Sequence, residues 1–174
     1  MRKNIIYSLL LVVAALFAGC DSRLDIEKHG NMGDQNDFYQ TDEQIEQAVA
    51  SMYSNLKGLY YNWFFTKNLL SDDVWCGGGQ RGDNTSLEQL NEYTYGTDNG
   101  MIQGVFSGLY GLIYQSNLVI EKVADDTPVK KRAIAEAKFF RAWANFELVT
   151  LWGTAPLVDH LLEPGEYRQG NSTP

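Results

Sequence analysis

The sequence has little of the residue types that build disulfide-stapled or metal-bound proteins. Its 174 residues include only two cysteines and two histidines. Two cysteines are too few for the disulfide framework of a small secreted domain. The histidines, His29 and His160, lie in separate loop regions, and neither has a second metal ligand at a usable spacing. We therefore predict two exposed histidines and no metal site.

Catalytic motifs are also missing. No glycine-rich phosphate loop precedes a helix, and no Ser-His-Asp or Cys-His set is visible. Asp72-Asp73 could be read as a pair of carboxylates for glycoside hydrolysis, which needs two carboxyl groups about 5–10 Å apart that face one bond. Adjacent side chains usually point apart, and an aspartate in a turn more often bonds to the backbone. The sequence therefore predicts a protein that is not an enzyme and needs no cofactor.

Positive charge is scarce as well. The formal net charge is −8, which disfavours nucleic acid and anionic lipid headgroups as partners. This balance does not bear on neutral ligands such as sugars. Aromatic residues, by contrast, are plentiful, with ten Tyr, eight Phe and four Trp. Because the loops hold more of them than solubility requires, a surface that binds flat, uncharged molecules fits the composition.

The N-terminus contains the longest apolar run, and it is too short to cross a bilayer. Ile5–Ala18 has 14 residues, whereas a spanning helix needs about 20. Two basic residues precede this run, and small residues at positions 18 and 19 lead to Cys20. The pattern predicts a lipoprotein signal peptide over residues 1–19, lipidation of Cys20 (palmitate included) and a polar tether over residues 20–40. A plain secretory signal is the alternative. Cys76 would then remain a sheltered free thiol.

Helical signals begin at Thr41. Thr41 and Gln44 match a capping box, and apolar residues follow at steps of three and four. Gly58 marks the predicted end of this helix, and a short aromatic helix over residues 62–70 is expected to fold back on it. Residues 71–99 show no helical period. A third helix is predicted from Gly100 to about residue 124, with these residues on its buried side: Ile102, Val105, Phe106, Leu109, Ile113, Val119, Ile120 and Val123. Its glycines, Gly104, Gly108 and Gly111, are expected where another backbone packs close.

The most unusual helix runs from Pro128, after the predicted N-cap Thr127, to a stop at Gly153. Its polar residues form two opposed stripes, and Arg141 in one of them is expected to pair with a carboxylate of another helix. Two apolar flanks lie between the stripes. The first is Ala133, Ala137, Phe140, Ala144, Leu148 and Leu151; the second is Ala135, Phe139, Ala142, Phe146 and Val149. A helix that is apolar on two sides is sandwiched between neighbours, which predicts an all-α stack of helices.

A candidate ligand-binding site lies in the irregular loop. A sugar site without chemistry needs aromatic faces for the ring and planar polar groups for its hydroxyls. The loop supplies both kinds, which makes the following the candidate binding residues: Trp75, Tyr93 and Tyr95, with Arg81, Asp83 and Asn84. The alternative is that Trp75 packs against the scaffold and the rest is solvated loop. At the other end, Asn171-Ser172-Thr173-Pro174 matches a helix start, so we expect residues 41–174 to be the N-terminal part of a longer helical domain.

Several blocks together resemble the SusD/RagB family of outer-membrane lipoproteins of Bacteroidetes. The first blocks are the lipobox with Leu24-Asp25, Phe38-Tyr39-Gln40-Thr41-Asp42-Glu43 and Asp72-Asp73-Val74-Trp75. Next come Leu109-Tyr110 and Ser116-Asn117-Leu118-Val119-Ile120-Glu121. The most specific block runs from Ala135-Glu136-Ala137-Lys138-Phe139-Phe140-Arg141 to Leu151-Trp152-Gly153 and Pro156-Leu157-Val158. Asn145 departs from the family pattern, which usually has tyrosine there.

This resemblance implies a tetratricopeptide-like helical scaffold and a protein that binds glycans or other nutrients at the outer membrane, on the cell surface. It also implies a partner, a SusC-like TonB-dependent β-barrel transporter that receives the ligand. Two other functions stay open at this point. One is a lipid-anchored helical-repeat module for protein interactions. The other is a lipoprotein hydrolase, which the lack of an acid/base pair disfavours.

Overall fold

The computed structural model describes residues 38–171 of the chain. The chain divides into two units, Met1–Gln35 and Asn36–Pro174, and the described residues belong to the second. The predicted signal peptide, Cys20, His29, most of the predicted tether and the last three residues lie outside the described range.

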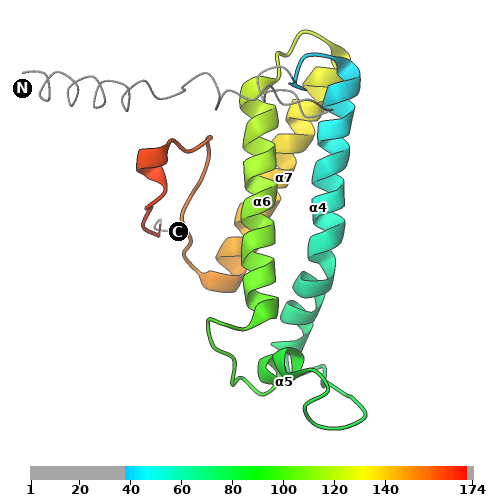
Figure 1. Ribbon diagram of the computed structural model, residues 1–174, viewed down its shortest axis with the longest axis vertical. Coiled ribbons are helices and arrows are strands. Elements are labelled where there is room, and N and C mark those ends of the chain that lie inside the picture. Colours follow the sequence, from blue (N-terminus) through cyan, green and yellow to red (C-terminus); the bar gives the residue numbers. More distant parts are fainter. Residues whose placement is uncertain (1–37, 172–174) are drawn as a thin grey trace, which may run out of the picture. The chain divides into compact units, whose positions relative to one another are not determined.

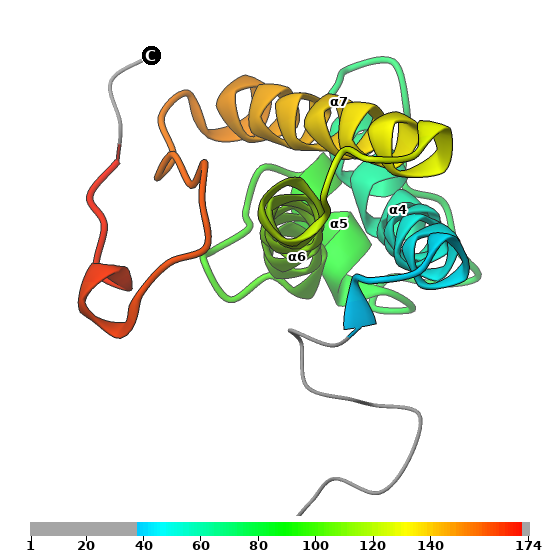
Figure 2. The same ribbon diagram turned by 90° about the horizontal axis from the view of Figure 1, so that it is seen from above.

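The described residues form four α-helices and no strand. The helices are α4 (Asp42–Leu69), α5 (Thr85–Asn91), α6 (Gly100–Lys122) and α7 (Pro128–Trp152), followed by the 3-10 helix η1 (Pro164–Glu166). The helices α4, α6 and α7 run down, up and down beside one another in Figure 1, and each contacts the other two. Figure 2 looks nearly along α6, with α4 beside it and α7 slanting across both. The all-α prediction is confirmed.

The predicted helix starts are also confirmed. Thr41 Oγ1 accepts a hydrogen bond from the Gln44 amide at 3.3 Å, and Gln44 Oε1 accepts one from the Thr41 amide at 3.0 Å. Thr127 caps α7 and also donates to Asp42 Oδ1 at 2.8 Å, which joins the first turns of α4 and α7. Gly153 ends α7 at a φ of 73°, a conformation that favours glycine.

The prediction of two helices between residues 41 and 70 is wrong, because α4 continues through Gly58. This glycine lies where a Cβ would meet nothing within 4 Å, so it costs the helix only its intrinsic propensity, about 1 kcal/mol. The buried stripe resumes at once with Leu59, Thr66 and Leu69. Packing along the whole length of α6 outweighs the local stop signal, as is usual for helices in proteins.

The prediction that residues 71–99 have no helix also needs correction. The seven residues of α5 begin after Asn84, whose Oδ1 accepts from the Leu87 amide at 3.3 Å. Leu87 and Leu90 are buried, and they form a small second core with Leu69 and Met101. Two turns are too short for an apolar period to stand out from the surrounding loop.

The main core lies between α4, α6 and α7. Its fully buried side chains include Ile45 and Met52 of α4, Val105, Leu109, Leu112 and Ile113 of α6, and Leu148 of α7. The glycines of α6 do face α4: a Cβ at Gly108 would lie 2.8 Å from Leu59 Cδ1. The space over them is filled by side chains of α4 rather than by its backbone. Phe106, predicted to be buried, is 38% exposed.

The two apolar flanks of α7 have opposite environments. On the first flank, Phe140 and Leu148 are 3% and 1% exposed, and the three alanines between and before them are buried. On the second flank, Phe139 and Phe146 are 67% and 62% exposed. The predicted sandwich is therefore wrong for residues 38–171, because this part of the chain supplies α4 and α6 on one side of α7 only.

A buried carboxylate joins α4 to α7. Glu147 is 3% exposed, and its Oε2 accepts from Trp63 Nε1 at 2.8 Å and from Lys67 Nζ at 2.9 Å. The Lys67 ammonium also lies 5.2 Å from the centre of the Trp63 ring. Removing either donor would leave a buried charge with one partner fewer, which is costly.

After α7 the chain is bound to α6. Arg141 Nη1 donates to Asn117 Oδ1 at 2.9 Å and to the Asp159 carbonyl at 2.5 Å, and Asn117 Nδ2 donates to the His160 carbonyl at 2.8 Å. The expectation of a carboxylate partner for Arg141 on another helix is therefore wrong, because an amide and a backbone carbonyl take that place. Tyr110 donates to the Pro156 carbonyl at 2.7 Å. These bonds hold residues 156–161 against the side of α6.

His160, which is exposed as predicted, lies between two carboxylates of the same segment. Its Nδ1 is 2.8 Å from Asp159 Oδ1 and its Nε2 is 3.2 Å from Glu166 Oε2. Hydrogen bonding to Asp159, and then to Glu166, raises the pKa of His160 above its ordinary 6.5. The hydrogen bond from His160 lowers the pKa of Asp159. The pKa of Glu166 is lowered by the hydrogen bond from the Glu163 amide and, after it, by the hydrogen bond from His160.

These shifts predict a pH-dependent contribution to stability. A raised pKa of His160 stabilises the fold fully below the unfolded value of 6.5, and this stabilisation is lost as the pH rises through the folded value. The two carboxylates, whose pKa values are lowered in the folded state, contribute stability above their unfolded pKa values. This contribution is lost as the pH falls through the folded values. We expect the melting temperature of wild type to exceed that of His160→Gln most near about pH 5.5, and less at about pH 8. A difference that stays constant across this range contradicts the ion pairing.

Candidate ligand-binding site

The candidate loop lies at one end of the helical bundle, between α4 and α6 (Figure 1). It is anchored by the small core under α5, so its shape is set by packing and not by the bundle alone. Two hollows open beside it, one bordered by Trp75 and one by Tyr95. The six predicted binding residues are therefore not gathered in one site.

Trp75 does not pack against the scaffold, since it is 77% exposed. It borders a hollow of about 270 Å³ together with Arg81 and Glu92. Arg81 Nη2 forms an ion pair with Glu92 Oε2 at 2.7 Å, which holds the guanidinium beside the indole's hollow. This arrangement presents a free aromatic face next to a positioned planar donor, which suits stacking with an uncharged ring.

Asp83 and Asn84 use their acceptors within the loop. Asp83 Oδ2 accepts from the amides of Gly79 and Gln80, at 2.6 Å and 3.0 Å. Asn84 caps α5. Both side chains therefore shape the glycine-rich turn between Cys76 and α5.

Tyr93 and Tyr95 have different surroundings. Tyr93 has a φ of 56°, which is rare for a residue with a side chain, and its hydroxyl donates to the Leu70 carbonyl at 2.6 Å. This bond ties the loop back to the end of α4. Tyr95 is 40% exposed and borders the second hollow.

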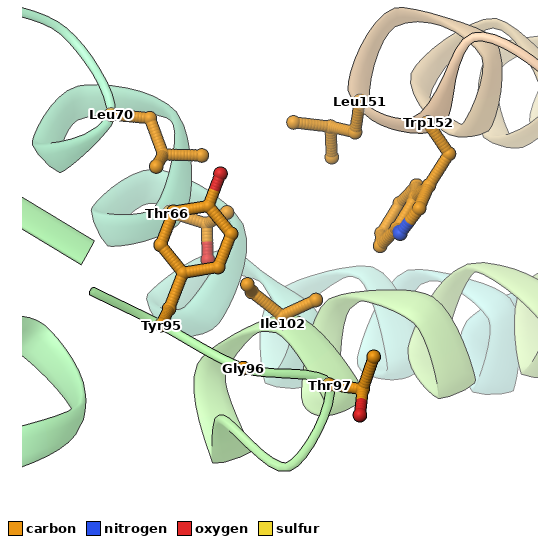
Figure 3. A pocket seen from close by; sticks show the side chains of 8 residues that line it. All are labelled: Thr66, Leu70, Tyr95, Gly96, Thr97, Ile102, Leu151 and Trp152. Carbon is orange, nitrogen blue, oxygen red and sulfur yellow. The ribbon is translucent and has the colours of Figure 1, made fainter. Parts of the chain in front are cut away.

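The second hollow is the larger one, with a volume of about 450 Å³. Figure 3 shows the rings of Tyr95 and Trp152 on opposite sides of it, with Ile102 between them. Its lining comes from the ends of three helices and from the loop: Thr66, Leu70, Tyr95, Gly96, Thr97, Ile102, Leu151 and Trp152. None of these residues is charged. The volume lies within the range of small-molecule sites, about 300–1,000 Å³.

Thr66 is the least expected member of this lining. It is 2% exposed, and its Oγ1 has no hydrogen-bond partner, although buried hydroxyls almost always have one. Thr66, Leu151 and Trp152 were not identifiable as site residues from the sequence, because Thr66 lies on α4 and the other two lie at the end of α7, far apart along the chain. Only the buried stripe of α4, in which a threonine interrupts the apolar residues, gives a signal.

Cys76 borders the Trp75 hollow and is half-buried as a free thiol. Burial, followed by the charges of Glu88 and Glu92, raises its pKa, which keeps the thiol protonated at neutral pH. Across the described part of the chain, no three His, Cys, Asp or Glu side chains are placed to hold a metal ion. No helix within residues 38–171 is long and apolar enough to cross a membrane.

Comparison with known proteins identifies the family. A family model described as SusD-like, starch-binding and associating with the outer membrane matches residues 24–169. The chain belongs to the SusD-like family. A SusD-like protein of Bacteroides ovatus is 32% identical over 166 residues, which cover 87% of this chain and 29% of that protein. SusD-like protein P38 of Formosa agariphila is 27% identical over 156 residues, which cover 89% of this chain and 30% of that protein.

The SusD-like chain thus spans about a third of the length of the curated relatives it matches. No solved structure matches it. The match to the family confirms the resemblance to SusD/RagB proteins, and the helical architecture is the one that this resemblance implies.

Proposed function

We propose that this chain belongs to a non-enzymatic lipoprotein that binds glycans or related nutrients at the outer membrane. The observation that carries the proposal is the loop of a SusD-like chain in which Trp75 is 77% exposed beside the positioned guanidinium of Arg81. An aromatic face and a planar donor side by side are what a neutral sugar ring needs. The net charge of −8 does not oppose a neutral ligand.

The proposal assigns no catalytic step to the chain. Asp72 and Asp73 are both exposed just after α4, and the Asp73 amide donates a hydrogen bond to Ser71 Oγ at 3.4 Å. His160 is engaged by two carboxylates on a surface segment. A binding role needs only exposed aromatic rings and polar groups, which the loop has. Hydrolysis would require an acid/base pair, which these residues do not supply.

We further propose that residues 41–174 are the N-terminal part of a longer helical domain. Two facts support this: the relatives are about three times as long, and the second flank of α7 exposes two phenylalanines. Further helices packed on Phe139 and Phe146 would complete the sandwich that the sequence of α7 predicts. In that domain the loop of residues 71–99 would contribute one part of the ligand surface.

The partner and the anchor are proposals of the same kind. A SusC-like TonB-dependent transporter would receive the ligand from this protein, and acyl chains on Cys20 would hold the protein at the membrane after removal of residues 1–19. A polar tether over residues 20–40 would give the binding domain freedom to sit on the transporter. We place the protein on the cell surface, where glycans arrive.

The competing proposal is a lipid-anchored module that binds proteins. The exposed flank of α7 favours it, because large exposed apolar patches mark interaction sites. The two proposals differ in what the purified protein binds: a sugar with the loop, or a protein with α7.

The binding proposal predicts that loop aromatics set the affinity for a neutral oligosaccharide. We expect Trp75→Ala and Tyr95→Ala each to weaken binding of maltoheptaose about five- to thirtyfold, since truncating a binding anchor costs about 1–2 kcal/mol. Calorimetric titration of the purified protein measures this. Tyr167→Ala, at another exposed ring that belongs to the C-terminal segment, serves as the control and should leave the affinity unchanged. Equal affinities for all three variants would contradict a site in the loop, and turnover of the sugar would contradict a binding role.

The anchoring proposal predicts a lipid on Cys20. Mass spectrometry of the protein from its native host should show an acylated N-terminal peptide that begins at Cys20. Cys20→Ala should abolish this modification and release the protein from the membrane fraction. Cys76→Ala, at a half-buried thiol, should leave both unchanged. If Cys20 of the wild-type protein carries no acyl group, the lipoprotein assignment is contradicted.

A further inference from the structure

We infer that the cavity between the ends of α4, α6 and α7 is a subsite for one uncharged sugar ring. This inference rests on the proposed glycan-binding function and names a second place where that function operates. It involves Thr66, Ile102 and Trp152, which lie outside the candidate loop. The Trp75 hollow is a separate feature, with a separate lining.

The cavity has the shape and the surfaces that a ring requires. Tyr95 and Trp152 stand on opposite sides, so that a flat molecule between them can lie against an aromatic face (Figure 3). Ile102, Leu70 and Leu151 line the space between the two rings. The C–H faces of a pyranose suit such walls, because they lose unfavourable contact with water there.

The hydroxyl of Thr66 lies in the same cavity and needs a hydrogen-bond partner. Its Oγ1 is buried and without a partner, which costs free energy for as long as no group hydrogen-bonds to it. A hydroxyl group both donates and accepts, so a sugar hydroxyl or a water molecule can satisfy it. An alkyl ligand cannot do so and would seal the unpaired group away from water.

The charge of the ligand follows from the lining. No charged residue borders the cavity, so an ionic ligand would lose its hydration without gaining a counter-ion. A purely apolar ligand would leave the Thr66 hydroxyl without a hydrogen bond, and an ionic ligand would have no counter-ion in the cavity. An uncharged ring that has both C–H faces and hydroxyls meets all the observed features of the cavity.

The loop makes the subsite part of the larger binding surface. Tyr95, Gly96 and Thr97 form one wall, and the same loop carries Trp75 further upstream. Tyr93 fixes this wall to α4 through its bond to the Leu70 carbonyl. A glycan that binds to the loop can therefore place one of its rings in this cavity, because the loop forms one of the cavity walls.

The decisive variant is Thr66→Val, which removes the hydroxyl and keeps the shape of the side chain. Because it deletes a buried, unpaired polar group, we expect the melting temperature to rise. If the hydroxyl binds a sugar, the affinity for maltoheptaose should fall about tenfold at the same time. Stability and affinity then move in opposite directions, which a purely structural role of Thr66 does not produce.

A second measurement works on the unmodified protein. Methyl α-D-glucopyranoside and maltoheptaose are titrated into isotope-labelled protein, and the NMR signals of the Trp152 indole N–H and the Thr66 methyl are followed. We expect both signals to shift with both sugars. The indole signal of Trp143, which packs against Trp63 on α4, is the internal control and should not shift.

Each contrary outcome is distinct. Unchanged affinity of the more stable Thr66→Val variant overturns the subsite. Maltoheptaose that shifts the Trp75 indole signal but neither cavity signal overturns the subsite and leaves the proposed glycan-binding function standing. If neither sugar shifts any signal, the subsite and the proposed binding of starch-like glycans by this chain both fail.

Discussion

The contact on which the described structure depends is the first flank of α7 packed into the seam between α4 and α6. Phe140 and Leu148 fill this seam, and the alanines beside them let the helices approach. Tyr53 of α4 meets the Phe140 ring edge-on, with ring centres 4.9 Å apart. With the seam closed, the bond from Thr127 to Asp42 and the buried Glu147 fix α7 lengthwise along α4. The ends of the three helices are then held in one place, and the hollow beside Tyr95 is built on those ends.

The helical bundle carries an irregular loop at one end, and this loop presents exposed aromatic side chains. Three polar side chains of the loop form hydrogen bonds with backbone groups, namely those of Asp83, Asn84 and Tyr93. The rings of Trp75 and Tyr95 are exposed. This division of labour suits recognition of a neutral ring, in which shape and aromatic faces matter more than charge. The SusD-like family, described as starch-binding, is consistent with such a surface.

Local chemistry made much of the fold predictable. The capping residues Thr41 and Thr127 and the stop at Gly153 act within one helical turn, so their effect is visible in the sequence. The prediction of a helix end at Gly58 failed because packing between α4 and α6 outweighs the low helix propensity of one glycine. The cavity at Thr66 could not be predicted, because it forms only when the ends of three helices meet. The two-flank pattern of α7 predicted that both flanks are buried, but within residues 38–171 only the first flank is, because α4 and α6 both pack on that side.

The asymmetry of α7 can be tested with two neighbouring phenylalanines on one helix. Urea unfolding of Phe140→Ala and Phe139→Ala compares a side chain that is 3% exposed with one that is 67% exposed. We predict that Phe140→Ala lowers the free energy of unfolding by about 3–5 kcal/mol and that Phe139→Ala changes it by less than about 0.5 kcal/mol. Equal losses in the two variants would mean that both flanks are packed in this chain, which would contradict the account.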